Sequence, residues 1–247
     1  MMSSSEVNLL SISLKQYFYK LKAHTGLVNR LIITQMLALF FSLGGVNSMS
    51  YAFGSGNIFV SVSGYSANIV IVFSMMWIIS VAILLTTKEY KRMEMPLVGN
   101  RVSANLSDIG FLMTTSVFAG ITASLVSVLL RVIMYFTFDR SKMVLDGFFL
   151  SYSDLFMGMG VAILYMILIS AIGYFLGSMS LMNMVILILL ATPFVGIFRV
   201  YNILAQMAFN FIAFENSLPL FALKVICISI VLFGASLLLS NRKEVRQ

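Results

Sequence analysis

Six long apolar stretches constrain the fold of this 247-residue chain more than any other feature of its sequence. They run over residues 31–53, 68–87, 109–135, 153–177, 181–201 and 220–239. Each stretch is long enough to cross the ~30 Å hydrocarbon core of a bilayer as a helix. Continuous apolar runs also lack the alternation that a transmembrane barrel requires. The sequence therefore predicts an all-α integral membrane protein with six transmembrane helices.

Composition supports this class, because 60% of the residues are hydrophobic and only 10% are charged. Soluble domains carry about 25% charged residues, so a water-soluble globular fold is excluded. We expect a cytoplasmic segment over residues 1–30, a membrane domain over 31–240 and a basic cytoplasmic tail over 241–247. The expected surroundings are a lipid bilayer. The net charge of +7 therefore reflects membrane topology and indicates no nucleic-acid partner.

The distribution of Lys and Arg predicts the orientation of the chain. Of the 16 basic residues, eleven fall in segments on the side of the N-terminus and five on the opposite side. Because cytoplasmic segments carry the excess of Lys and Arg, we expect both termini in the cytoplasm. The connection between the fourth and fifth spans, residues 178–180, is so short that these two spans must form a tight antiparallel hairpin.

The N-terminal segment has helical periodicity before the first span. One face would carry its apolar residues, which are Val7, Leu10, Leu14, Tyr17, Phe18 and Leu21. Lys15, Lys20 and Lys22 lie off that face. We expect an amphipathic helix in the cytoplasmic interface. The alternative is a solvated helix that packs on its own protein.

The connection over residues 88–108 is the most charged part of the sequence. Its charged residues are Lys88, Glu89, Lys91, Arg92, Glu94, Arg101 and Asp108. Pro96 interrupts it. We expect Asn105, Ser107 or Asp108 to cap the third span, because small polar side chains accept hydrogen bonds from first-turn amides.

Two features within the spans suggest contacts between helices. Arg131 and Asp154 fall near the outer ends of the third and fourth spans, where they would form an ion pair that closes the outer side. The alternative is that each side chain reaches the headgroups. Gly173 and Gly177 would let two helices approach closely. We favour the hairpin of spans four and five over a dimer seam for this pair, and Pro193 should kink the fifth span.

Catalytic and cofactor motifs are missing from the sequence. It contains neither a phosphate-binding loop nor a dinucleotide fingerprint, and its one histidine, His24, suits a polar surface position. A single cysteine excludes a disulfide framework. We therefore expect no enzyme activity, no cofactor and no metal in this chain. The spans also lack a row of acidic residues, which disfavours an ion-coupled carrier.

Two short stretches resemble a known family. Residues 88–101, KEYKRMEMPLVGNR, are similar to the cytoplasmic loop before the third span of small bacterial ABC exporter permeases of the second class. Residues 172–177, IGYFLG, resemble the end of that family's fourth span. The order of segments matches that of the family over nearly the whole chain.

The resemblance implies a permease subunit in a bacterial cell membrane that exports a peptide, a drug or another amphipathic molecule. ATP hydrolysis would occur in a separate cytoplasmic ATPase subunit, and a second permease copy or a paralogous permease would complete the pathway. The N-terminal helix would be the connecting helix. The loop that docks on the ATPase would use Glu89, Lys91, Arg92, Glu94 and Arg101. The alternative for this loop is that its charges only set topology.

Two other functions stay open at this point. The chain would also suit a non-transporting membrane protein, such as an immunity or scaffold factor that sequesters a toxic peptide. A secondary transporter is the third reading. It is disfavoured by the missing acids and by the lack of an obvious inverted repeat between the two halves.

Overall fold

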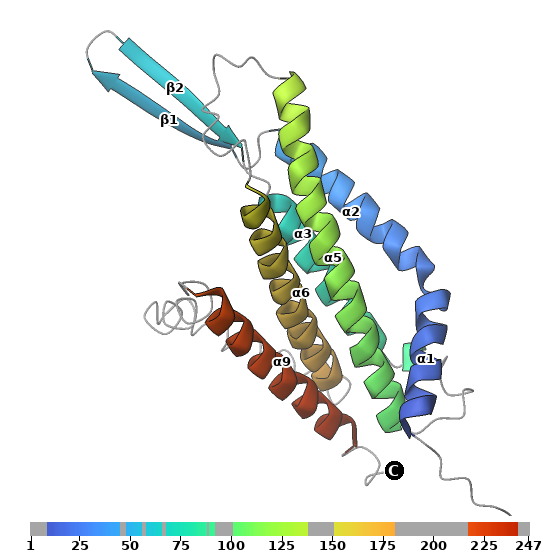
Figure 1. Cartoon of the computed structure of the whole chain (residues 1–247). Helices are drawn as coiled ribbons and strands as arrows, with labels where there is room; N and C mark the ends of the chain where they lie inside the picture. Colours follow the sequence, from blue (N-terminus) through green and yellow to red (C-terminus); the bar gives the residue numbers. More distant parts are fainter. Residues whose placement is uncertain are drawn as a thin grey trace, which may run out of the picture. The chain divides into compact units, whose positions relative to one another are not determined.

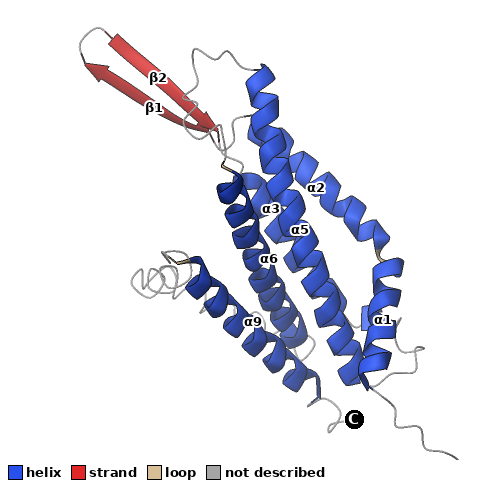
Figure 2. Cartoon of the chain, in the orientation of Figure 1, coloured by secondary structure: helices blue, strands red, loops and turns tan. Residues whose placement is uncertain are grey.

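The computed structural model describes residues 9–44, 48–55, 58–65, 68–87, 89–91, 101–137, 151–180 and 217–241. Helices dominate these residues (Figures 1 and 2). The elements in chain order are α1 (Leu9–Ala23), α2 (Thr25–Leu43), β1 (Ser48–Ser55), β2 (Ile58–Tyr65), α3 (Asn68–Thr86), α5 (Arg101–Thr137), α6 (Tyr152–Ser180) and α9 (Leu218–Asn241).

Five of these helices are long and apolar enough to span a membrane: α2, α3, α5, α6 and α9. They confirm the coarse prediction of an α-helical, multi-pass membrane protein. The predicted fifth span, 181–201, lies outside the described residues together with Pro193, so a count of six spans stays a prediction. The predicted second, fourth and sixth spans agree with α3, α6 and α9 to within a few residues.

The predicted first span, 31–53, was wrong at both ends. Helix α2 begins at Thr25 and ends at Leu43, and the chain then forms an antiparallel hairpin in which Ser48 pairs with Tyr65 and Ser55 with Ile58. The helix stops where Gly44 and Gly45 follow it, because glycine is a poor helix former and favours helix ends. The apolar run continues past this stop, so hydropathy alone hid the boundary.

The predicted loop over residues 88–108 was too long. Helix α5 begins at Arg101, so residues 101–108 of the predicted loop are helical. With 37 residues, α5 is about 55 Å long, which exceeds the ~30 Å hydrocarbon core. A part of this helix therefore lies outside the hydrocarbon. Asn105, Ser107 and Asp108 are not caps, because they lie in the second and third turns of the helix.

Burial in this chain differs from that in a soluble protein, although many apolar side chains such as Leu31 and Leu112 are buried in its core. Large apolar side chains are exposed along the candidate spans, with Phe40 at 74% and Val231 at 69%. Several polar side chains are instead fully buried between helices, among them Gln35, Ser74, Ser116, Asp108 and Ser170. A water-soluble monomer rarely exposes so much apolar surface. The exposed side chains fit a hydrocarbon surrounding, whereas the buried polar groups need partners inside the protein.

The chain divides into two compact units. One comprises residues 26–77 and 117–166. Within it, the Gln35 amide of α2 donates to the hydroxyl oxygens of Ser74 on α3 and Thr122 on α5, at 3.0 Å each. Gly120 of α5 lies so close to Ile163 of α6 that a Cβ would come within 3 Å of the Ile163 backbone. Interhelical hydrogen bonds and small residues are the usual means of packing membrane helices.

The other unit comprises residues 1–25, 78–116 and 167–247. Within it, Gly173 and Gly177 of α6 lie against α3. A Cβ at Gly173 would come within 3 Å of Ala82 and Ile79, and one at Gly177 would collide with Thr86. The two glycines therefore admit α3, whereas the sequence favoured the following span as their neighbour.

Candidate functional site

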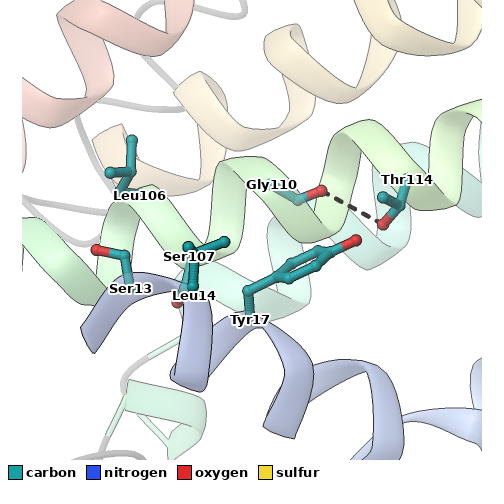
Figure 3. A pocket seen from close by; sticks show the side chains of 7 residues that line it. All are labelled: Ser13, Leu14, Tyr17, Leu106, Ser107, Gly110 and Thr114. Carbon is teal, nitrogen blue, oxygen red and sulfur yellow. Dashed lines mark hydrogen bonds between the residues drawn. The ribbon is translucent and has the colours of Figure 1, made fainter. Parts of the chain in front are cut away.

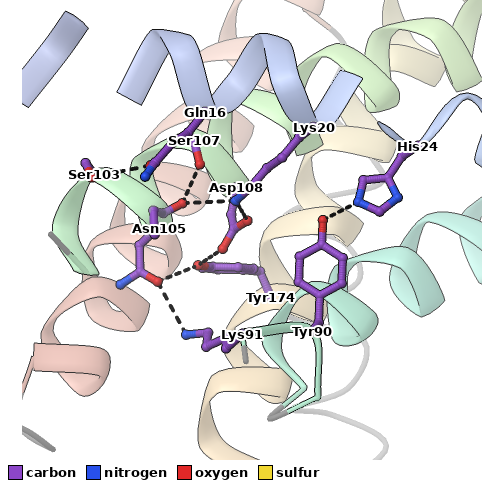
Figure 4. A network of polar contacts seen from close by, with 11 residues as sticks. Gln16, Lys20, His24, Tyr90, Lys91, Ser103, Asn105, Ser107, Asp108 and Tyr174 are labelled. Carbon is purple, nitrogen blue, oxygen red and sulfur yellow. Dashed lines mark hydrogen bonds and ion pairs between the residues drawn. The ribbon is translucent and has the colours of Figure 1, made fainter. Parts of the chain in front are cut away.

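The candidate site is a buried polar network in the unit that contains α1 (Figure 4). Helix α1 turns polar residues toward α5: Ser13 and Lys20 are buried, and Gln16 and Tyr17 are half-buried (Figure 3 shows Ser13 and Tyr17). Leu14 and Phe18 are more than half exposed. The helix is amphipathic as predicted, but it packs on the protein through its polar side. Lys20, which we expected to lie off the apolar face of an interfacial helix, is buried against the protein.

The centre of the network is an ion pair between Lys20 of α1 and Asp108 of α5. The Lys20 side chain is 4% exposed and that of Asp108 is 1% exposed. The Lys20 ammonium also donates to the backbone carbonyl of Ala104, at 3.4 Å. A buried carboxylate and ammonium each need a charged partner and further hydrogen bonds to be tolerated away from water. This network supplies both.

Tyr174 extends the network to α6. Its hydroxyl donates its one proton to the Asp108 Oδ2 at 3.2 Å or to the Asn105 Oδ1 at 3.3 Å. The Lys91 ammonium donates to the same Asn105 oxygen at 3.4 Å. The amide nitrogen of Asn105 is buried and has no hydrogen-bond acceptor among the described residues. One carboxylate and one amide thus connect α1, α5, α6 and the turn at residues 89–91.

A second contact links His24, the residue that directly follows α1, to the same turn. The His24 Nε2 and the Tyr90 hydroxyl are hydrogen-bonded at 2.5 Å, and the two ring centroids lie 5.3 Å apart. The His24 ring also meets Phe111 of α5 edge-on, at 5.8 Å between centroids. His24 is therefore half-buried and bonded, and the prediction of a plain surface position was wrong.

Local sequence explains how Tyr90 and Lys91 reach the network. Thr87 follows α3, and its hydroxyl donates back to the Leu84 carbonyl at 2.8 Å. The same oxygen accepts the Tyr90 amide at 3.4 Å, and the Thr87 carbonyl accepts the Lys91 amide at 3.1 Å. A threonine in this role both ends one helix and starts the next turn. The turn therefore holds both side chains close to the end of α3.

The network joins several helices through buried polar contacts. Each described member of the network contacts another helix or the turn at residues 89–91. Removal of one partner of a buried ion pair lowers the free energy of unfolding by about 3–5 kcal/mol. The turn at residues 89–91 is bonded to α5 through Lys91 and Asn105, and the network continues from α5 to α6 through Tyr174 and to α1 through Lys20. No group of three or more His, Cys, Asp or Glu that could hold a metal ion occurs within the part of the chain that the structure describes.

The predicted site residues fall in three places. Of the loop residues, Lys91 joins the network and Glu89 is exposed, while Arg101 begins α5. Arg92 and Glu94 lie outside the described residues. Arg131 is half-buried on α5 and Asp154 is exposed in the first turn of α6, so their outer ion pair stays a prediction. Gly173 and Gly177 pack against α3.

Sequence reasoning missed most of the network. Lys20 and His24 were visible as an i, i+4 polar pair on a helix, and the SANLSD run at residues 103–108 was visible as a polar turn next to an apolar span. Neither signal says which element covers the polar face. Tyr174 gave no polar signal of its own, although it lies inside the IGYFLG stretch.

The comparisons with known proteins identify no relative. No family model, curated protein or solved structure is significantly similar to this chain.

Proposed function

We propose that this chain is the membrane-spanning permease subunit of an ATP-driven ABC exporter of the second class, and that a separate ATPase subunit drives it. The observation that carries the proposal is the buried network of Lys20, Asp108, Asn105, Tyr174 and Lys91. It ties the beginning of the charged segment 88–101 to three helices. The proposal also rests on the resemblance of that segment to the cytoplasmic loops of small permeases.

A driven permease needs such a connection for a physical reason. The energy of ATP hydrolysis in a partner reaches the membrane helices only if a cytoplasmic contact is stiff enough to transmit movement. A loop that is loosely attached to the spans would absorb the movement by bending. In the proposed mechanism the ATPase binds the segment over residues 88–101, and the network passes its displacement to α5 and α6.

The partners follow from the same proposal. Glu89, Lys91, Arg92, Glu94 and Arg101 would contact the ATPase, and α1 would be the connecting helix beside the contact. A second copy of the chain or a paralogous permease would complete the pathway in a bacterial plasma membrane. The exported molecule would be a peptide, a drug or another amphipathic compound.

Purification of the tagged full chain from its own membranes tests this proposal. We expect a protein with a phosphate-binding loop to co-purify with the wild-type chain and to dissociate from the K91E/R92E variant. The R30E variant is the matched control, because Arg30 is an exposed basic residue of α2 on the same predicted side. Absence of an ATPase from the wild-type sample, or equal retention by the K91E/R92E variant, would falsify the proposal.

A secondary transporter is the second candidate, and one observation favours it. Asp108 is a buried carboxylate on a helix that is long enough to span a membrane, and it contacts Lys20 and Tyr174. Ionisable groups within membrane helices frequently bind coupling protons. The two candidates differ in their energy source. Export that continues after ATP depletion and stops when the proton gradient is dissipated would favour the carrier.

A further inference from the structure

Residue pairing in the β1–β2 hairpin (Figure 2) assigns its residues to two unlike faces. Successive residues of a strand alternate between the faces, and directly paired residues share one face. We define the apolar face by the hydrophobic residues that fall on it, which are Met49, Tyr51, Phe53, Ile58, Val60 and Val62. The opposite face, which we call the serine face, holds mainly Ser48, Ser50, Ala52, Ser61 and Ser63, together with Phe59 and Tyr65. The hairpin is therefore amphipathic along its length.

Short connections hold the hairpin beside two membrane-length helices. Residues 44–47 join α2 to β1, and residues 66 and 67 join β2 to α3. At ~3.6 Å per residue, the shorter connection lets Tyr65 and Asn68 lie no more than about 11 Å apart. Both α2 and α3 are long and apolar enough to cross a membrane. The base of the hairpin therefore lies at the membrane surface.

The hairpin also belongs to a stretch without charge. Residues 31–87 include no Lys, Arg, His, Asp or Glu. Surfaces that face water carry many charged residues, and docking of soluble proteins is commonly steered by them. The hairpin has no charged group for such docking. A strand pair without charge can instead rest against lipid with no cost for desolvating an ionised group.

The open edges of the hairpin limit how deeply it enters the membrane. Among the described residues its sheet has two strands, so each strand keeps one edge that no other strand pairs. Open edges do not occur in hydrocarbon, because unpaired backbone groups are costly there. In water alone, an isolated two-stranded hairpin is at best marginally stable. The layer of lipid headgroups meets both conditions, since water reaches the edges there and acyl chains cover an apolar face.

We propose that the β1–β2 hairpin lies flat in the headgroup layer of the bilayer, with its apolar face toward the acyl chains and its serine face toward water. An upright hairpin would leave the apolar face in water. The partner of this surface is a lipid membrane, with no requirement for anionic headgroups, because the hairpin has no charge. The inference depends on insertion of the chain in a membrane and is independent of any ATPase, so failure of the transport proposal would leave it intact.

Spin labelling of the full chain in phosphatidylcholine vesicles tests this placement. Single cysteines are introduced along β1 in a C227S background, because Cys227 is the only cysteine of the chain. Each cysteine carries a nitroxide, and its collisions with oxygen, which concentrates in lipid, and with a water-soluble nickel complex are measured. We expect a several-fold higher ratio of oxygen to nickel collisions for Y51C and F53C than for the adjacent S50C and A52C. V60C and V62C should resemble Y51C and F53C, because the register pairs them.

Three results would overturn the proposal. Shielding of Y51C and F53C from both reagents would show that a second copy or another part of this chain covers the apolar face. Nickel access at all four β1 positions would show that the hairpin stands in water. Oxygen access at all four without alternation would place the whole hairpin in hydrocarbon. Size-exclusion chromatography checks that each variant is monodisperse before labelling, so that each pattern reports on folded protein.

Discussion

At the scale of single residues, the ion pair of Lys20 and Asp108 is the most consequential contact in the chain. Charges this deeply buried cost several kcal/mol each to desolvate, so the pair is a poor source of stability compared with apolar packing. The pair instead specifies how α1 packs on α5. The pairing requires a placement of α1 on α5 that brings the ammonium to the carboxylate, and the Ala104 carbonyl and the Tyr174 hydroxyl add further hydrogen bonds.

The first prediction concerns that pair. We expect K20M and D108L each to lower the free energy of unfolding by about 3–5 kcal/mol, because each leaves an uncompensated buried charge. The double variant K20M/D108L should recover part of this loss. Unfolding of the purified chain in detergent by denaturant measures all three values. Strictly additive losses would contradict a direct pairing.

The second prediction concerns Tyr174. Removal of its hydroxyl in Y174F leaves the Asp108 and Asn105 oxygens with one donor fewer, so we expect a loss of about 1–2 kcal/mol. Y152F is the matched control, because Tyr152 lies on the same helix and is 87% exposed. The same denaturant titration compares the two variants, and equal stability of both would rule out a role for the Tyr174 hydroxyl.

At the scale of elements, the contact of α3 with α6 depends on two glycines. Gly173 and Gly177 lie one helical turn apart, and a side chain at either would meet α3. Apolar side chains gain little from each other when lipid tails are the alternative, so close backbone approach is what membrane helices use instead. Tyr174 lies between these two glycines on the same helix, and its hydroxyl contacts Asp108 and Asn105.

The third prediction follows from this packing. We expect G177L to prevent the close approach of α3 and to lower the yield of monodisperse protein sharply. G158L is the matched control, because Gly158 lies on the same helix with nothing within 4 Å of a Cβ. Size-exclusion chromatography of both variants in detergent measures the difference. A monodisperse G177L sample with the thermal stability of the wild type would show that the approach is not required.

The sequence predicted the positions of the helices better than the contacts between them. The helices α3, α6 and α9 followed from continuous apolar runs, because hydropathy reports which segments avoid water. The end of α2 could not be predicted from hydropathy, since the apolar run continues into the hairpin after Gly44. The network was hidden for another reason. Periodicity shows that α1 has a polar face with Lys20 on it, but only the tertiary structure shows that α5 covers that face with Asp108.

At the scale of the whole molecule, the five membrane-length helices and the charged segment 88–101 together define the proposed function. The segment must face the side on which an ATPase is present.

The fourth prediction concerns the topology of the chain and uses a C227S background, because Cys227 is exposed. We expect a cysteine at exposed Glu89 to react with a membrane-impermeant thiol reagent only in inverted vesicles. One at exposed Tyr152 should react in intact cells. The reverse pattern would contradict cytoplasmic docking.

The central claim is that energy for this membrane protein arrives from a partner through the charged segment and the network behind it. ATP hydrolysis by the affinity-purified full chain measures this most directly. We expect hydrolysis to migrate with the wild-type chain in size-exclusion chromatography, to fall to background with K91E/R92E and to persist with R30E. No hydrolysis in the wild-type peak, or undiminished hydrolysis in the K91E/R92E peak, would contradict the claim.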